Sequence, residues 1–284
     1  MTLEGKKLQA KPFLKWVGGK SKLVPLLKER FPSEYNDYYE PFLGGGALFF
    51  TMNDKRAHVN DMNEVLIQAY INIQMNVELL VKKLNSIQSE YMSLTGLEAK
   101  KVYFLEKRTE YNSLKNNDFS KTAYLIFLNK TCFNGMYREN SKGGYNVPFG
   151  KQEKPNICDE SNLQSVSKAL QHTTISNGSY LSAIKNAKMG DFIYLDPPYH
   201  PINSTSSFTA YQAGGFTAED QEKLRDTFVD LSERGCKVMV SNSNASLIKE
   251  LYKKYNTYEI QAARSINSAA SGRGKITELI ITSY

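Results

Sequence analysis

The chain has only three cysteines among its 284 residues, and Cys132, Cys158 and Cys236 lie far apart in the sequence. An odd number of cysteines at such wide spacings argues against a disulfide framework and fits a reducing compartment. No stretch approaches the roughly 20 consecutive apolar residues that span a bilayer, and the first residues lack the apolar core of a signal peptide. The sequence therefore predicts a soluble, cytoplasmic protein.

Histidine is equally scarce, with His58, His172 and His200 only. Together with the cysteines, these residues form no spacing typical of zinc ligands, so neither a structural zinc site nor a zinc deaminase is expected. We predict no metal site. Internal repeats and low-complexity tracts are also absent. With 41% hydrophobic and 23% charged residues, the composition is that of a globular protein, which excludes disordered and fibrous classes.

The chain has a modest basic excess that is unevenly distributed. The formal net charge is +7, and residues 66–175 alone hold 14 basic and 10 acidic residues. A polyanionic partner such as nucleic acid would explain a basic middle third. An ordinary lysine-rich surface explains it equally well, so charge alone does not decide between the two.

The first third of the chain has the alternation of an open parallel α/β sheet. Tyr38–Phe42 is predicted as a strand that ends at the turn Gly44–Gly46, and Ala47–Met52 is predicted to open a helix. Ala57–Asn60 follows as a second short strand and stops at Asp61. A strand, a glycine turn, a helix and a strand in this order are typical of a βαβ unit.

The middle third has a different character. Apolar residues recur at helical spacing over Glu64–Leu84 and Glu98–Leu114, and Tyr124–Leu128 continues the trend. Residues 129–151 are rich in glycine, asparagine and aromatic residues, and Gly143-Gly144 between short extended runs indicates a hairpin.

The α/β alternation resumes near Thr173. Strands are predicted at Phe192–Leu195, Lys237–Ser241 and Thr277–Thr282. A helix is predicted to begin at Thr217, with Asp220 at the spacing of a capping box, to bury Leu224, Phe228 and Leu231, and to stop at Gly235. We predict an α/β domain formed by residues 1–65 and 173–284, interrupted by a mostly helical insertion over residues 66–172.

Four segments carry candidate chemistry, and the first is Lys15–Lys20. Its Gly19-Lys20-Ser21 is similar to the end of a phosphate-binding loop, but that motif needs a glycine where this chain has Leu14. Nucleotide hydrolysis is therefore not expected. A tryptophan beside two glycines and two lysines suits a planar, charged ligand, although a surface loop has the same composition.

The second segment is Glu40–Gly46. Glycines at the carboxyl end of a first strand let the backbone approach a ligand, and Asp61 at the end of the next strand can accept hydrogen bonds from ribose hydroxyls. These features predict a nucleoside-binding site. The glycine run differs from G-x-G-x-x-G, so a dinucleotide is not the first choice.

The third segment, Asp196-Pro197-Pro198-Tyr199, directly follows a predicted strand. Two prolines hold the backbone extended and remove two N–H donors. The Asp196 carboxylate and the Pro197 carbonyl can then point outward as acceptors, beside the flat ring of Tyr199. This combination suits an exocyclic amine on a stacked heteroaromatic ring. A rigid turn would explain the prolines but not the acid and the aromatic residue together.

The fourth segment, within Thr131–Gly150, combines aromatic residues, amides and Arg138 on the predicted hairpin. Arginine can read guanine O6 and N7 with two hydrogen bonds, and an aromatic side chain can fill the gap that a flipped base leaves. The same aromatic residues could instead pack into a core.

The motifs KWVGGK, EPFLGGG and DPPY occur in the order found in the Dam family of DNA adenine-N6 methyltransferases. The sequence resembles this family from about Lys11 to Thr282, and most of all its DpnM-like, GATC-modifying methylases. The resemblance implies a Rossmann-like α/β sheet that uses S-adenosylmethionine, with an inserted, mostly helical DNA-recognition domain.

The resemblance also implies roles for individual residues. Asp196, Pro197 and Tyr199 would be catalytic, with Tyr199 stacked on an adenine that has left the duplex. Phe133 would be the wedge, Asn134 would contact the DNA backbone and Arg138 would read a guanine. The cofactor would contact Trp16, Lys20, Phe42, Gly44, Gly46, Asp61, Tyr180 and Asp196.

Two further expectations concern DNA. Pro148 lies in the segment NVPFG, which looks like part of the family's base-reading hairpin. Residues 271–275 form a basic, glycine-rich loop. Its Arg273 and Lys275 would approach DNA phosphate or the cleft, or the loop is a simple exposed turn.

The resulting prediction is a site-specific methyltransferase that acts on a flipped adenine in double-stranded DNA, within GATC. The enzyme is expected to be a monomer, with a possible cognate restriction endonuclease that shares its site. Three alternatives stay open. A related class methylates a glutamine amide in proteins, usually with Asn in the place of Asp196. A DNA-binding module could retain a vestigial cofactor pocket, and single-stranded DNA or RNA could be the preferred substrate.

Overall fold

The computed structural model describes residues 9–52, 56–202, 216–263 and 275–284. Internal contacts divide these residues into two compact units. The helical unit contains residues 9–19, 44–52 and 63–173, and the sheet unit contains residues 20–43, 56–62, 174–202, 216–263 and 275–284.

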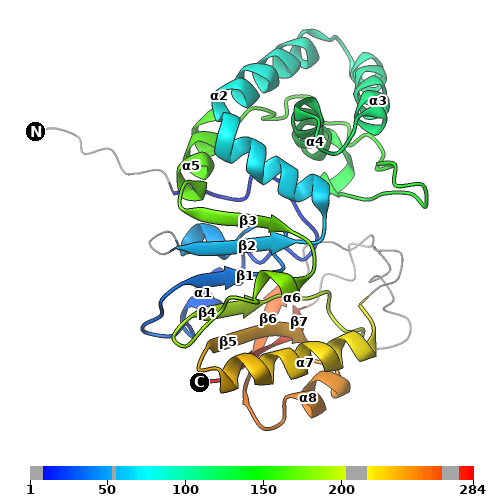
Figure 1. Ribbon diagram of the computed structural model, residues 1–284. Helices are drawn as coiled ribbons and strands as arrows, with labels where there is room; N and C mark the ends of the chain where they lie inside the picture. Colours follow the sequence, from blue (N-terminus) through cyan, green and yellow to red (C-terminus); the bar gives the residue numbers. More distant parts are fainter. Residues whose placement is uncertain (1–8, 53–55, 203–215, 264–274) are drawn as a thin grey trace, which may run out of the picture. The chain divides into compact units, whose positions relative to one another are not determined.

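Seven strands form one sheet in the order β3-β2-β1-β4-β5-β7-β6 (Figure 1). β1 runs parallel to β2 and β4, and β4 runs parallel to β5, whereas β7 is antiparallel to both β5 and β6. The result confirms the predicted Rossmann-like α/β class. The strands are β1 (Tyr38–Glu40), β2 (Ala57–Asp61), β3 (Thr173–Asn177), β4 (Phe192–Leu195), β5 (Lys237–Ser243), β6 (Asn256–Ala263) and β7 (Lys275–Thr282).

The centre of the sheet is apolar because its parallel strands are covered on both faces. All four residues of β4 are buried, and Ile193 and Leu195 belong to a core cluster with Val238 and Val240 of β5. The helix α7 (Ala218–Glu233) adds Leu224, Phe228 and Leu231 to this cluster, as its spacing predicted.

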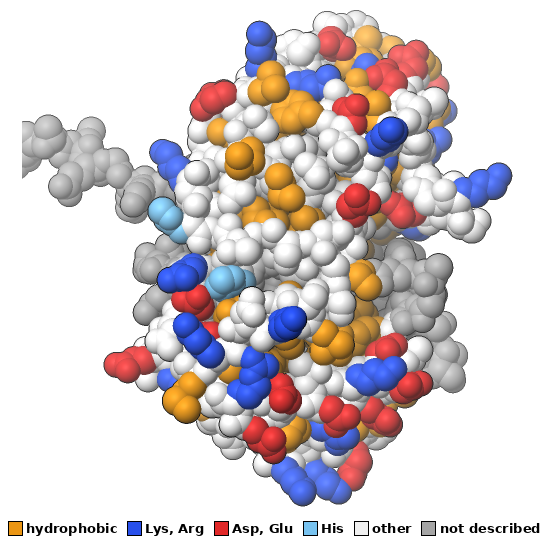
Figure 2. All heavy atoms as spheres, viewed as in Figure 1, with side chains coloured by type: hydrophobic (Ala, Val, Ile, Leu, Met, Phe, Trp, Pro, Cys, Tyr) orange, Lys and Arg blue, Asp and Glu red, His pale blue; other side chains and the backbone are white. Residues whose placement is uncertain are grey.

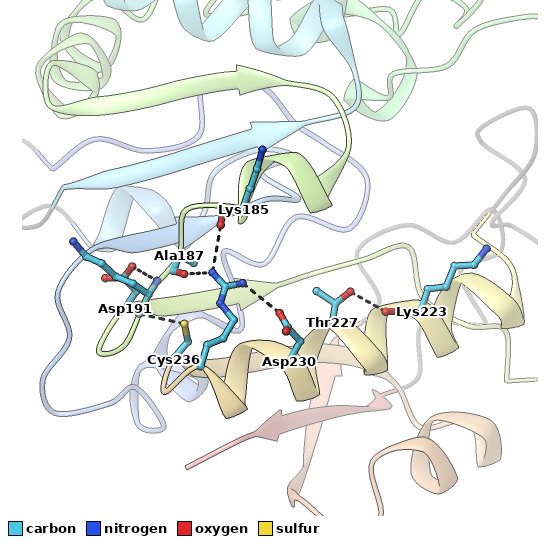
Figure 3. Close-up of polar contacts among 9 residues, drawn as sticks. Lys185, Ala187, Asp191, Lys223, Thr227, Asp230 and Cys236 are labelled. Atoms are coloured by element: carbon cyan, nitrogen blue, oxygen red, sulfur yellow. Dashed lines mark hydrogen bonds and ion pairs between the residues drawn. The ribbon is translucent and has the colours of Figure 1, made fainter.

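Helix α7 begins and ends where the sequence indicated. Thr217 and Asp220 form a capping box, and Gly235 follows the last turn with a φ of +80°. Arg234 then donates hydrogen bonds to the carbonyls of Lys185 and Ala187, and its guanidinium lies 3.3 Å from Asp230 (Figure 3). These contacts fix the end of α7 to the segment that leads into β4.

The helical unit is built around long amphipathic helices. The buried side chain of Asn72 on α2 donates a hydrogen bond to Thr122 on α4 at 2.8 Å, and both residues are almost inaccessible to solvent. The elements of the unit are α2 (Glu64–Ser93), α3 (Leu97–Ser113), α4 (Phe119–Thr131), α5 (Glu160–Leu170) and the 3-10 turns η1 (Phe49–Thr51) and η2 (Phe133–Gly135). The sheet unit also contains the short helices α1 (Val24–Lys28), α6 (Tyr180–Ala183) and α8 (Ser246–Leu251).

Several local predictions differ from the structure. The helix expected over Ala47–Met52 is only the 3-10 turn η1, and the first strand ends at Glu40 because the chain turns at the following Pro41. The prediction overlooked α5 and β6. The hairpin over residues 129–151 has two isolated bridges, Cys132 to Phe149 and Glu139 to Tyr145, instead of a continuous ladder.

The surface carries charges of both signs. Over α7, basic and acidic side chains are interspersed (Figure 2), and Lys223 pairs with Glu219 one turn away at 3.0 Å. Apolar side chains gather over α2 in the same view, where Met75 and Leu79 are more than half exposed. Among the described residues, no helix has the length and apolar character that crossing a membrane requires.

Candidate active site

The segment Asp196–Tyr199 directly follows β4, at the carboxyl end of a central parallel strand. Lys20 Nζ lies 2.9 Å from Asp196 Oδ2, and the same ammonium lies 4.7 Å from the centre of the Tyr199 ring. The Tyr199 hydroxyl donates a hydrogen bond to Glu278 Oε2 on β7 at 2.7 Å. Lys20, Asp196 and Tyr199, which the sequence predicted at the cofactor and the catalytic site, therefore lie together with a carboxylate that the sequence did not single out.

Burial is the largest influence on the pKa values of Asp196 and Tyr199. Burial raises the pKa of Asp196 to about 6, the Lys20 ammonium opposes this rise, and the Glu278 carboxylate adds to it. The pKa of the Tyr199 phenol is raised well above 10 by burial and by the neighbouring carboxylates. At neutral pH Asp196 is thus mostly ionised, and Tyr199 stays protonated as a donor to Glu278.

One oxygen of Asp196 has no hydrogen-bond partner in the part of the chain that the structure describes. Whereas Oδ2 pairs with Lys20, Oδ1 is buried without any donor among the described residues. A buried acceptor of this kind is costly unless a water molecule or a ligand donates a hydrogen bond to it. The pair of oxygens can therefore hold a cation on one side and an amine on the other.

Buried amides hold the backbone of the same loop. Gln221 Nε2 on α7 donates to the Pro198 carbonyl at 2.9 Å, and Asn242 Oδ1 on β5 accepts from the His200 N–H at 3.2 Å. Sequence reasoning missed Gln221, Asn242 and Glu278. For Gln221 a signal existed, because it lies on the apolar face of α7 three residues before Leu224 and is completely buried.

Aromatic residues expected at the cofactor contact one another in the sheet unit. Phe42 stacks on Tyr180 with ring centroids 5.1 Å apart, and Phe216 meets Phe42 edge-on at 6.2 Å. Asp61 ends β2, and its backbone carbonyl accepts hydrogen bonds from Gly178 N at 3.2 Å and from the Asn177 side chain at 2.8 Å. The ends of β2 and β3 are joined at this point.

In the helical unit, Trp16 stacks on Tyr137 of the hairpin with ring centroids 4.8 Å apart. Gly44 has a φ of +49°, and a Cβ at this position would lie only 3.2 Å from the Trp16 ring, so the close approach requires glycine. Gly46 also has a positive φ, of 66°. The buried Asn129 side chain holds Lys15 through both its backbone N–H and its carbonyl, at 2.9 Å each.

The hairpin presents some of the side chains expected to read DNA. Phe133 is 51% exposed, and Asn134 has a left-handed φ of 57°, which asparagine tolerates better than most residues. Arg138 donates from Nε to Asn146 Oδ1 at 2.6 Å and from Nη2 to the Asn146 carbonyl at 3.2 Å. The Pro148 carbonyl accepts from Phe133 N at 2.9 Å.

Two further residues, Arg273 and Lys275, were predicted to contact DNA. Arg273 lies outside the described residues. Lys275 is the first residue of β7, where it pairs with Ala263 of β6. Among the described part of the chain, no group of three or more His, Cys, Asp or Glu residues could hold a metal ion.

Comparison with known proteins identifies the class. Residues 16–266 match the family described as D12 class N6 adenine-specific DNA methyltransferase. The chain therefore belongs to this family of enzymes, which methylate adenine in DNA, and the resemblance to the Dam family is confirmed.

Individual relatives agree with this assignment over nearly their whole length. The Type II methyltransferase M1.LlaDCHI of Lactococcus lactis subsp. cremoris is 40% identical, with 99% of this chain and 98% of the relative covered. The Type II methyltransferase M.MjaIII of Methanocaldococcus jannaschii is 38% identical, with 98% and 100% covered. The DNA adenine methylase of Escherichia coli (strain K12) is 31% identical, with 94% and 93% covered.

Proposed function

We propose that this enzyme transfers a methyl group from S-adenosylmethionine to N6 of an adenine that has rotated out of double-stranded DNA. The observation that carries the proposal is the arrangement around Asp196, a largely buried carboxylate that has one oxygen paired with Lys20 and, among the described residues, no donor for the other. An exocyclic amine supplies the missing N–H groups.

The residues fit the proposed cofactor by their chemistry. In the sheet unit, Lys20, Phe42, Asp61, Tyr180 and Asp196 would contact it, and in the helical unit Trp16, Gly44 and Gly46 would do so. Carboxylates suit its ribose hydroxyls and ammonium, and aromatic rings suit its adenine. When bound, the cofactor supplies a methyl group made electrophilic by its sulfonium.

Asp196 has the central role in this mechanism. Adenine N6 is a weak nucleophile because its lone pair is delocalised into the ring. Hydrogen bonds from N6 to Asp196 and to the Pro197 carbonyl would favour a more tetrahedral nitrogen and stabilise the positive charge that it gains. The methylated nitrogen would then lose one N6 proton to Asp196 or to water, with S-adenosylhomocysteine as the leaving group. Positioning of the reacting groups in this way can contribute about 7–11 kcal/mol.

Tyr199 would hold the base by stacking. The Lys20 ammonium covers one face of the ring at 4.7 Å, so the base would stack on the opposite face. The hydrogen bond from its hydroxyl to Glu278 holds the end of the ring in place before the base arrives. Stacking there would offset the few kcal/mol that extrusion of a base costs.

The hairpin is proposed to select the site, and the inserted helices over residues 66–172 to serve as the recognition domain. Arg138 has two of its five N–H donors on Asn146, which leaves donors on the guanidinium for a guanine edge. Phe133 is exposed enough to act as the wedge, and Asn134, Pro148, Arg273 and Lys275 are proposed to contact DNA. The sequence GATC rests on the resemblance to GATC-modifying methylases.

Two relatives are named Type II methyltransferases. Their names support the proposal that a restriction endonuclease shares the recognition site of this enzyme. We propose that the enzyme itself acts as a monomer.

The test is transfer of labelled methyl from S-adenosylmethionine to duplexes that contain GATC, with scrambled duplexes, single-stranded DNA and RNA in parallel. Label at adenine N6 confined to GATC duplexes is the expected result. Label spread over many adenines would remove the sequence assignment, and label only on single strands or RNA would remove the duplex assignment. Cofactor binding without any nucleic-acid label would contradict the proposal as a whole.

A further inference from the structure

The loop after β4 contains Pro197 and Pro198, which have no backbone N–H. A loop with two missing donors cannot be fixed by an ordinary ladder of backbone hydrogen bonds. Other groups must therefore determine where Pro198, Tyr199 and His200 lie.

Two buried amide side chains contact this backbone on both sides of Tyr199. Gln221 on α7 donates to the Pro198 carbonyl, and Asn242 on β5 accepts from the His200 N–H. The amides also bond to each other, from Asn242 Nδ2 to Gln221 Oε1 at 2.9 Å. Both side chains are completely inaccessible to solvent.

The donor and the acceptor of each hydrogen bond in this series are fixed. A backbone N–H can only donate, and Asn242 Oδ1 accepts from both His200 N and Ser243 N. The Asn242 amino group must consequently face Gln221, whose own amino group must face the Pro198 carbonyl. Neither amide can be reversed without placing two acceptors or two donors against each other.

We propose that Gln221 and Asn242 are positioning residues for methyl transfer: together they hold the backbone on both sides of Tyr199 and so fix the ring and the adjoining Pro197 carbonyl for the base. This inference rests on the proposed function of the Asp196–Tyr199 loop. Reacting groups must be aligned closely, and a displacement of about 1 Å can cost 10²-fold in rate. Buried amide pairs that specify one arrangement of a loop meet this requirement.

The test uses Gln221→Met and Gln221→Glu in the full chain. Methionine has a similar shape but neither donates nor accepts strongly, so we expect kcat to fall at least tenfold at every pH, with the cofactor affinity unchanged. A protonated glutamic acid can still donate to the Pro198 carbonyl and accept from Asn242, whereas its ionised form offers two acceptors. The ratio of the kcat of Gln221→Glu to that of the wild type should therefore decrease as pH rises.

A buried amide elsewhere provides the matched control. Asn72→Asp makes the same kind of change at a side chain that bonds to Thr122, far from the loop in sequence. We expect it to lower the melting temperature, while the ratio of its kcat per folded molecule to that of the wild type stays the same at every pH. The comparison distinguishes a positioning role from a structural role. Loss of stability alone neither changes kcat at saturating substrates nor makes the ratio of kcat to that of the wild type depend on pH.

The outcomes distinguish the two levels of the proposal. A kcat of Gln221→Met equal to that of the wild type overturns the positioning role, as does a pH-independent ratio for Gln221→Glu, while adenine methylation itself stands. A wild-type enzyme that methylates no adenine overturns the proposed function, and the inference with it.

Discussion

The loop after β4 and the hairpin of the helical unit differ in how far the side chains assigned to their functions are exposed to solvent. The loop is held by buried side chains, since Gln221, Asn242 and Glu278 are each at most 9% exposed. The hairpin also buries Tyr145 and Val147, but its Phe133 projects with about half of its surface exposed. Chemistry at one nitrogen needs fixed groups, whereas recognition of a long polymer needs side chains that solvent can reach. The difference predicts that variants in the two places fail in different ways.

The largest effect is expected at Asp196. Asp196→Ala should abolish methylation, and the isosteric Asp196→Asn should lower the single-turnover rate by at least roughly a hundredfold, because both remove the charge that stabilises the developing positive charge on N6. The preference for GATC in DNA binding should persist, since the hairpin is unchanged. Rates are measured by quench, and binding by fluorescence anisotropy. Turnover like that of the wild type in either variant would refute the mechanism.

Arg138→Ala should have the reverse effect. Loss of the guanidinium should leave methylation active but reduce discrimination at one base pair by about 1–3 kcal/mol. The measurement is the ratio of kcat/KM for GATC to that for duplexes with single substitutions. Lys142→Ala, an exposed lysine near the hairpin turn, serves as the control and should weaken all sequences alike. If Arg138→Ala keeps full selectivity, the hairpin does not read the sequence through this residue.

A smaller effect is expected from Lys20→Met on the pH dependence. Since burial raises the pKa of Asp196 to about 6, the wild-type rate should fall about tenfold per unit below that pH as the carboxylate is protonated. The Lys20 ammonium lowers this pKa, so its removal should move the decline to higher pH. Single-turnover rates between pH 5 and 8 at saturating cofactor measure the shift.

The matched control is Lys223→Met, which removes an exposed lysine paired with Glu219 and should leave the profile unchanged.

The stability of the fold also depends on pH through Asp196. The pKa of Asp196 is higher folded than unfolded, so its stabilising contribution is fully present below the unfolded pKa of about 3.9 and is lost as pH rises through about 6. Asp196→Asn should flatten that part of the stability curve. An unmoved rate profile in Lys20→Met would show that Asp196 is not the titrating group.

The smallest effect on sequence discrimination is expected at Asn146. This residue orients Arg138 but is not proposed to contact a base itself. Asn146→Ala removes the bond to Arg138 Nε and should reduce discrimination at the same base pair by about 0.5–1.5 kcal/mol. The same set of duplexes measures it. In the Arg138→Ala background the change should have no further effect on discrimination. An additive loss in the double variant would place Asn146 in an independent contact.

Sequence patterns predicted the regular elements well and the contacts between them poorly. The strand Phe192–Leu195 and the helix with its capping box at Thr217 were found because their signals are local. The prediction of a helix over Ala47–Met52 was wrong. Side chains that favour a helix do not show how many helical turns follow a glycine turn. Strand β6 has few buried residues and depends on its pairing with β7, which no local pattern reveals.

The candidate site shows the same limit. The acid, prolines and tyrosine of the loop could be recognised because they are consecutive in sequence. Glu278 could not be, since it reaches Tyr199 from a strand 79 residues later. Gln221 carried a usable signal, as a polar residue on the apolar face of α7, but its partner Asn242 follows only from the order of the strands.

The most direct test of the central claim is one experiment in which wild type, Asp196→Asn and Arg138→Ala are compared for single-turnover methyl transfer to GATC and to singly substituted duplexes, with binding measured in parallel. We predict that Asp196→Asn binds GATC selectively but transfers no methyl group at a useful rate, whereas Arg138→Ala transfers methyl groups to adenine with reduced selectivity. Loss of rate and selectivity together in both variants would contradict the separation of chemistry in the loop from recognition in the hairpin.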